Sequence, residues 1–200
     1  MDIDKVLRKQ RKSYKRFMLS MGFIFVLLPI ALYISRVLNI FFILYLMFVE
    51  ILVLFSMLIR YNEEYLSYNI SGTKLHIVTG ATKIKYSISS EKVAIVHVLP
   101  NEKYFDLMIV TKSRFRNKRL HHLDFKVLER FPEVEKIYNK LKMPEEGPYY
   151  FFYVRKGGIK KYLLLNFLYK HCVSATFSES SVEKIKEVIK LKDKASSKNK

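Results

Sequence analysis

A single glutamate in the middle of an apolar run is the residue whose chemistry is hardest to place. Glu50 stands inside "LYLMFVEILVLFSM", residues 44–57, where no other residue is charged. An ionised carboxylate is costly in hydrocarbon, so we expect the group to be largely neutral. A protonated glutamate donates and accepts hydrogen bonds, which hold membrane helices together at about 1 kcal/mol each. Self-association, or docking to a partner membrane protein, is the leading interpretation. A neutral acid without a role and a proton- or ion-conducting site in an oligomer are the alternatives.

A basic stretch, "TKSRFRNKR" at 111–119, is the second candidate for chemistry. If a strand beginning at Phe105 continues through it, a period of two places alternate residues on one face. The basic residues that would then share that face are Lys112, Arg114, Arg116 and Lys118. Each is worth up to about 1 kcal/mol beside an anionic membrane, so the ladder would orient a domain without anchoring it. A solvated loop without a ligand is the alternative. Nucleic acid is disfavoured, because no reading helix or base-stacking strand accompanies the charge.

The first sixteen residues carry seven Lys/Arg and two Asp, a net charge of +5. Such an arm sets membrane topology and contacts anionic headgroups; specific phosphoinositide-type binding is the alternative. The arm residues that we expect at anionic phospholipid are Arg8, Lys9, Arg11 and Lys12.

The remaining reactive residues form no recognisable constellation. The five histidines show neither His-x₃-His nor HExxH spacing, and His121 and His122 would point to opposite faces of a strand, so we expect no metal. Cys172 is the only cysteine, which excludes an intrachain disulfide and favours a buried small residue. No phosphate loop, nucleophile elbow or kinase signature occurs. We therefore expect no catalytic residue, no cofactor and no enzymatic activity.

The net charge of +18 and the 50% hydrophobic content are averages over unlike regions. The apolar runs at 17–34 and 40–59 predict helices over 17–35 and 39–59, roughly 27 and 30 Å long by their run lengths, enough to cross a bilayer. The five-residue connection "SRVLN" makes them an antiparallel hairpin over 17–59. The first run is too long for a cleaved signal peptide and a second span follows it at once.

Lys/Arg counting predicts the orientation of this hairpin. Seven basic residues precede the first span and Arg36 alone lies between the spans, so both termini should be cytoplasmic in a multi-pass cell-membrane protein. The expected organisation is a basic arm at 1–16, the hairpin, a cytosolic domain at 60–192 and a disordered basic tail at 193–200.

Alternating periodicity begins at Tyr65 and predicts a strand-rich domain. The segments expected as strands are "YLSYNIS", "TKLHIV", "TKIKYSI", "KVAIVHVL", "KYFDLMIVTK", "YYFFYVR", "IKKYLLL" and "HCVSATF". "PEVEKIYNKLK" at 132–142 predicts one interposed helix, either an insertion or the end of a first subdomain. A final helix is expected from about Ser181, with Ser180 as N-cap and Glu183 at the third helical position.

The runs "YNISGTKLHIVTGATKIKYSISSEKVAIVHVL" and "CVSATFSESSVEKIKEVI" resemble the opening and the close of bacterial PH-like (pleckstrin-homology-like) domains attached to membrane hairpins. The resemblance implies a mainly-β (α+β) PH-like barrel of about seven or eight antiparallel strands with a C-terminal helix. It rests on apolar spacing and implies no activity.

Together these features predict a membrane-anchored, non-enzymatic scaffold or regulatory module. It would act through protein contacts and anionic phospholipid at the inner leaflet, as a homo-oligomer or beside a partner membrane protein. The alternative is a subunit of a transport or channel assembly that uses Glu50.

Overall fold

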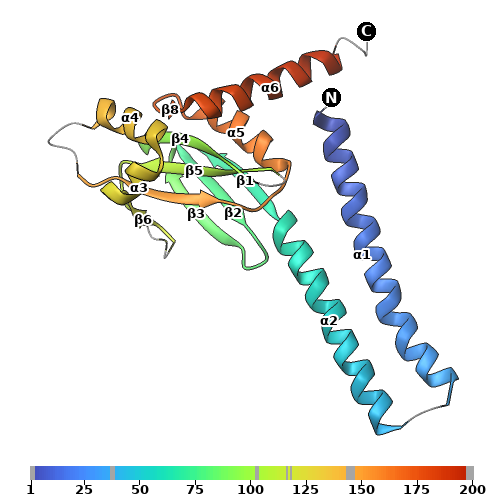
Figure 1. The fold of residues 1–200 in the computed structure, drawn as a ribbon. Coiled ribbons are helices and arrows are strands. Elements are labelled where there is room, and N and C mark those ends of the chain that lie inside the picture. The colour runs from blue at the N-terminus through green and yellow to red at the C-terminus, as the bar shows by residue number, and fades with distance from the viewer. Residues whose placement is uncertain are drawn as a thin grey trace.

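The computed structural model describes residues 3–36, 39–101, 104–115, 117, 119–142 and 147–196. Two long helices form a hairpin, and the chain beyond them folds into a mixed α+β domain with two sheets (Figure 1). In chain order the elements are α1 (Ile3–Ile34), α2 (Ile40–Glu64), β1 (Leu66–Ser71), β2 (Lys74–Thr79), β3 (Ile84–Ser89), a 3₁₀ turn (Ser90–Lys92), β4 (Val93–Pro100), β5 (Phe105–Thr111), β6 (His121–His122), α3 (Phe125–Arg130), α4 (Pro132–Leu141), β7 (Tyr150–Val154), α5 (Lys160–His171), β8 (Thr176–Phe177) and α6 (Glu179–Ser196).

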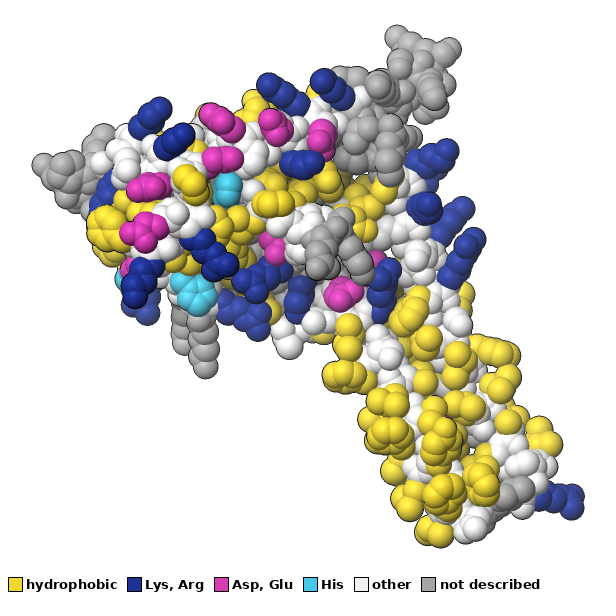
Figure 2. All heavy atoms as spheres, in the orientation of Figure 1, with side chains coloured by type: hydrophobic (Ala, Val, Ile, Leu, Met, Phe, Trp, Pro, Cys, Tyr) yellow, Lys and Arg dark blue, Asp and Glu magenta, His cyan; other side chains and the backbone are white. Residues whose placement is uncertain are grey.

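The hairpin is long and apolar enough to cross a membrane with both helices. Its large side chains face outward: Leu19 is 73% exposed and Ile40 is also 73% exposed. In Figure 2, hydrophobic side chains cover the visible face of the hairpin away from the folded domain. An apolar surface of this extent marks a site that contacts a membrane or another protein.

Both helices extend past the apolar runs at the end where the domain lies (Figure 1). Residues 3–16, expected as a separate arm, continue α1 as helix, and α2 runs five residues beyond Ile59. At the other end of the chain α6 reaches Ser196, so it enters the segment at 193–200 that was expected to be disordered. Residues 197–200 of that segment lie outside the described residues.

The strands form two sheets. β1, β2 and β3 make an antiparallel meander, as the alternating pattern predicts. The second sheet has the order β6-β7-β5-β4-β8, in which β8 runs parallel to β4. The described strands thus do not close into the expected barrel, and the expectation that every pairing is antiparallel is wrong at β8.

The five-stranded sheet is buried on both faces. On β5, Leu107 and Ile109 face the three-stranded sheet and α5, while Met108 and Val110 face α3 and α4. The two sheets meet where Tyr86 of β3 stacks on Phe152 of β7, with 4.3 Å between ring centroids. α4 packs on the opposite face of the five-stranded sheet from α5, in a second cluster of buried residues.

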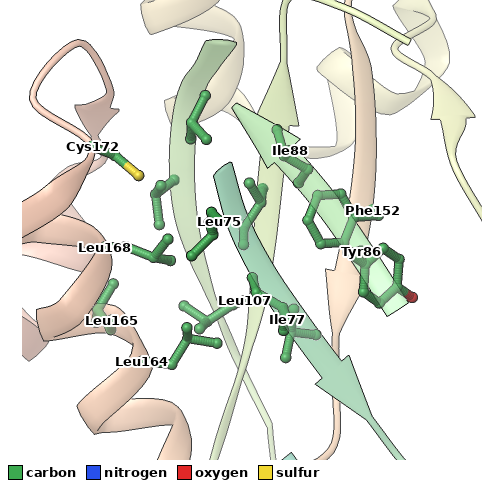
Figure 3. Packing of buried hydrophobic residues seen from close by; sticks show 14 of the residues in the cluster. Leu75, Ile77, Tyr86, Ile88, Leu107, Phe152, Leu164, Leu165, Leu168 and Cys172 are labelled. Atoms are coloured by element: carbon green, nitrogen blue, oxygen red, sulfur yellow. The ribbon is translucent and has the colours of Figure 1, made fainter. Parts of the chain in front are cut away.

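The largest difference from the sequence-based expectation is α5. The segment "IKKYLLL" at 159–165 was expected as a strand after a Gly157-Gly158 hairpin, but residues 160–171 form a helix instead. The buried residues Lys161, Leu164, Leu165, Leu168 and Cys172 recur with helical spacing. In Figure 3 the three leucines and the cysteine point from α5 toward Leu75 and Leu107 on the sheets. The apolar run "YLLL" hides this period, because it also suits a buried strand.

The cap of α6 lies two residues earlier than expected. Ser178, which is fully buried, accepts a hydrogen bond from the backbone N–H of Ser181 at 3.4 Å, and its carbonyl accepts from Val182 at 2.9 Å. Ser180, the expected cap, instead donates its hydroxyl to Glu133 at 3.0 Å. The prediction of a closing helix is confirmed, and that of its cap is wrong.

Candidate functional site at the hairpin junction

The hairpin joins the folded domain without a linker. α2 ends at Glu64, the N–H of Tyr65 still donates to the carbonyl of Tyr61 at 3.1 Å, and β1 begins at Leu66. A chain that passes directly from helix to strand has few free dihedral angles, so the direction of α2 sets the direction of the first sheet.

Asn62, in the last turn of α2, binds two other parts of the domain. Its side-chain oxygen accepts from the N–H of Ala81 at 2.9 Å and from the Lys156 ammonium at 2.6 Å. The carbonyl of Glu63 accepts from the N–H of Gly157 at 2.8 Å. The β2–β3 turn and the end of β7 are therefore both fastened to α2.

The N-terminal end of α1 is fastened to the same place. Gln10 donates to the Glu64 carboxylate at 2.6 Å and accepts from the N–H of Ile159 at 3.2 Å. One turn earlier, Leu7 is 8% exposed and packs against Ile159. Both helices of the hairpin thus hold the segment that leads into α5.

Gly157 makes this close approach feasible. Its φ of +110° lies in a region that favours glycine, and a Cβ there would come within 2.5 Å of the Leu66 side chain. Any side chain at this position would push β1 and α5 apart.

A hollow of about 300 Å³ opens beside the junction. Its lining is Gln10, Arg60, Glu63, Glu64, Asn101, Tyr104, Arg155, Lys156, Gly158 and Lys161. Lys161, 2% exposed, donates to Asp106 at 2.9 Å and to the carbonyl of Arg155 at 2.8 Å. Burial lowers the pKa of Lys161, and the hydrogen bond to Asp106 opposes that shift. Arg60 pairs with Glu64 at 3.2 Å. Of the cations that line this hollow, Arg60 and Lys161 are thus paired with acids, which suits a structural joint.

A second polar cluster ties α4, β4 and α6 together. His97, 6% exposed, has Ser178 at 2.9 Å, Ser180 at 3.3 Å and Glu133 at 3.6 Å from its Nδ1. Burial lowers the pKa of His97, against the pull of Glu133. Burial alone would raise the pKa of Glu133, but hydrogen bonds from Ser180 and the electrostatic effect of His97 lower it overall.

This cluster contains serine, histidine and a carboxylate without the geometry of a catalytic triad. In a triad the hydroxyl and the acid lie at opposite nitrogens of the imidazole. Here all the oxygens lie at Nδ1, and the nearest hydroxyl, that of Ser178, is fully buried and used as a cap. The cluster is a set of helix-end contacts.

The expected cationic ladder does not form as a strand. β5 ends at Thr111, so the continuation through 112–119 is wrong. Lys112 and Arg114 are exposed, and Lys112 lies 6.0 Å from the centroid of the Tyr149 ring. Arg116 and Lys118 lie outside the described residues. Whether this stretch contacts lipid stays a prediction.

The basic residues of the arm lie at graded distances from the apolar run of α1. Because residues 3–16 continue α1, a rise of 1.5 Å per residue puts Lys12 about 8 Å and Arg8 about 14 Å beyond the apolar run at 17–34. The polar layer of each leaflet is about 5–8 Å thick. Lys12 and Arg11 are thus better placed for anionic headgroups than Arg8 and Lys9, and their lipid contact stays a prediction.

Glu50 is half-buried in the hairpin. Within the described part of the chain its carboxylate has no hydrogen bond or ion pair. Its role in assembly stays a prediction.

The histidines and the cysteine occupy separate places. His121 packs on Phe151 and His122 on Tyr150, and no group of three potential metal-ligating side chains occurs among the described residues. Cys172 is buried as expected, although at the end of α5 and not on a strand, and burial raises its pKa to about 11.

The junction was missed at the sequence level for an identifiable reason. The short polar segments "NEE" at 62–64 and "RKGG" at 155–158 have no apolar periodicity, so a search for periodic patterns takes them for turns between helices and strands. The signal that marks them is their position: one directly follows a membrane span, and the other carries paired glycines beside paired cations.

Comparison with protein-family models, with characterised proteins and with solved structures finds no match to this chain.

Proposed function

We propose that this chain is a membrane-anchored, non-enzymatic regulatory or scaffold module. In this proposal the hairpin spans the cell membrane with both termini in the cytoplasm. The α+β domain, a PH-like module that departs from a closed barrel, stands at the inner leaflet and acts through protein contacts assisted by anionic lipid.

The observation that carries the proposal is the junction. Asn62, Glu63 and Gln10 accept hydrogen bonds from the segment after β7, and Asn62 accepts one from the β2–β3 turn. These bonds hold both parts of the domain against the helix ends. A tether that only concentrates a domain at a membrane needs no such contacts. A fixed orientation matters when one particular face must meet the membrane or a partner.

The described residues form no catalytic constellation, which also supports a binding role. Two buried polar clusters, Lys161 with Asp106 and His97 with its serines, are satisfied by hydrogen bonds within the fold. Groups satisfied in this way stabilise a structure and are poorly placed to exchange protons with a substrate.

Single-cysteine labelling of the full-length chain tests the orientation. Cys172 is buried with a raised pKa, so introduced cysteines should be the reactive ones. Asn39→Cys, in the turn of the hairpin, should react with a membrane-impermeant maleimide in intact cells, whereas Thr82→Cys, in the β2–β3 turn, should react only after permeabilisation.

A spin label at the same Thr82→Cys site tests the fixed position. Its collision rates with oxygen and with a polar nickel reagent should place it at the headgroup layer, whereas a label at Lys140→Cys on α4 should be in bulk water. Equal aqueous exposure of the two labels would mean that the domain swings freely, and the proposal would be wrong.

A further inference from the structure

Three cationic side chains line a second hollow that contains no carboxylate. Arg119, Arg155 and Lys156 border a space of about 300 Å³ between the edge of the three-stranded sheet and the end of β7. The rest of its lining is Thr79, Tyr86, His121 and Tyr153. Figure 2 shows Lys and Arg side chains gathered along this lower side of the domain, between the histidines and the top of the hairpin.

These three charges are not neutralised within the described residues. The ion pairs found there join other cations to their acids, as in Lys161 with Asp106 and Lys184 with Glu187. Burial lowers the pKa of Lys156, and the neighbouring Arg119 lowers it further, while Glu63 opposes the shift. Neighbouring cations destabilise one another's charged forms, and an anion placed between them stabilises those forms.

Two tyrosine hydroxyls share the field of these cations. Burial raises the pKa of Tyr86, and the charges of Arg119 and Arg155 partly offset that rise. Burial likewise raises the pKa of Tyr153, with Arg155 acting against it. The hydroxyls therefore stay protonated and are available as hydrogen-bond donors.

The cations are held in place by the fold. Asn117 donates to the carbonyl of Lys85 on β3 at 2.7 Å and accepts from the N–H of Arg119 at 2.8 Å. The Arg155 guanidinium lies over the Tyr153 ring, 5.0 Å from its centroid. Such prior positioning lowers the entropy cost of binding.

The hollow lies at the depth of lipid headgroups if the hairpin spans the membrane. The Lys156 ammonium is 2.6 Å from Asn62, which follows Ile59, the last residue of the apolar run, by three residues. Three residues of helix rise about 4.5 Å, and the polar layer of one leaflet is about 5–8 Å thick.

We propose that this hollow binds the phosphate of one anionic phospholipid headgroup, with the guanidinium groups of Arg119 and Arg155 as the main donors. Planar guanidinium groups match phosphate oxygens in pairs. The volume is at the lower limit of small-molecule sites, about 300–1,000 Å³, which suits a headgroup whose acyl chains stay in the bilayer. This ligand assignment rests on the membrane position in the proposed function.

Native mass spectrometry of the full-length chain in non-ionic detergent tests the site. The chain is titrated with phosphatidylglycerol, and separately with phosphatidylcholine of the same acyl length. We expect one phosphatidylglycerol to bind more tightly than phosphatidylcholine. The double variant Arg119→Gln/Arg155→Gln should weaken phosphatidylglycerol by about 25-fold, from about five-fold for each cation.

A charge-matched control separates a built site from general attraction. Lys126→Gln/Lys140→Gln removes the same number of charges from exposed positions on α3 and α4, and affinity should stay within about two-fold. Equal losses in the two double variants, no loss in the first, or equal binding of the two lipids would overturn the proposal.

Two further arms remove the remaining ambiguities. Inorganic phosphate displacing phosphatidylglycerol at an equal concentration would overturn the assignment to lipid.

If the arginine double variant has a lower melting temperature than the wild type, Tyr153→Phe replaces it. We then expect affinity for phosphatidylglycerol to fall by about five-fold for one hydrogen bond, and unchanged affinity would count against the site. The spin-label depth at residue 82 does not depend on these arginines, so failure of this inference and failure of the proposed function are distinguishable.

Discussion

At the scale of single residues, the buried ammonium of Lys161 is the most consequential feature. Asp106 is its only carboxylate within ion-pair distance among the described residues, at 2.9 Å. Removing one partner of a buried pair leaves an uncompensated charge, whereas replacing both by apolar groups is often neutral.

We therefore expect Asp106→Asn to lower the free energy of unfolding by about 3 kcal/mol, seen as a melting temperature lower by about 6–12 °C in detergent. Asp106→Leu/Lys161→Met should recover most of the loss. Glu187→Gln, which breaks an exposed pair, is the control and should change little. A double variant as unstable as the single one would show that the pair has another role.

His97 should make stability depend on pH. Its folded-state pKa lies below the ordinary value of 6.5. At pH values between those two pKa values, the unfolded chain binds more protons than the folded one. The free energy of unfolding is then highest above about pH 6.5 and falls as the pH drops toward the folded-state pKa. Glu133, whose pKa is also lowered, adds a further loss below its ordinary value of 4.5.

Melting temperatures at pH 7.5 and 5.5 measure this effect. The wild type should melt lower at pH 5.5, and His97→Gln should show a smaller drop. His122→Gln, at an exposed position on β6, should keep the full drop. An undiminished drop in His97→Gln would assign the pH dependence to other groups.

At the scale of elements, the junction of α2, β1 and α5 depends on one glycine. Gly157→Ala combines a positive φ with a 2.5 Å approach to Leu66, so we expect a loss of stability of about 3 kcal/mol. Gly72→Ala, with φ +58° and nothing within 4 Å, should cost only about 1 kcal/mol. Thermal unfolding of both variants in detergent separates the two contributions. Equal losses would mean that the close contact with Leu66 is unimportant.

At the scale of the whole molecule, Glu50 bears on assembly. An unpartnered acid in the hairpin gains a hydrogen bond when a second copy or partner helix supplies an acceptor. Glu50→Ala should raise the dissociation constant of a self-associated form by about five-fold, for one bond of about 1 kcal/mol, while Glu50→Gln should retain it.

Sedimentation in density-matched detergent measures that constant. Ser56→Ala is the control, because the Ser56 hydroxyl is already used by the carbonyl of Leu52 in its own helix at 2.9 Å. An oligomer of unchanged size in Glu50→Ala would remove the association hypothesis.

Local signals in the chain suffice for much of this molecule. Two long apolar runs, the second broken by Glu50 alone, define the hairpin, because runs of this length suit membrane spans. Alternation marks β1 to β3, a nearly continuous apolar run marks β4 and β5, and Pro132 with a four-residue apolar stripe marks α4. These elements owe their type to residues close in sequence, so periodicity reveals them.

The tertiary structure decided the rest. The run 160–171 is apolar enough for either a strand or a helix, and its docking between two sheets selects the helix. Likewise Arg119 and Arg155 are far apart in the chain and meet only because the loop after β5 folds over β3 while β7 ends beside it. A site built from distant residues leaves no local period in the sequence, because the spacing that matters is the distance across the fold.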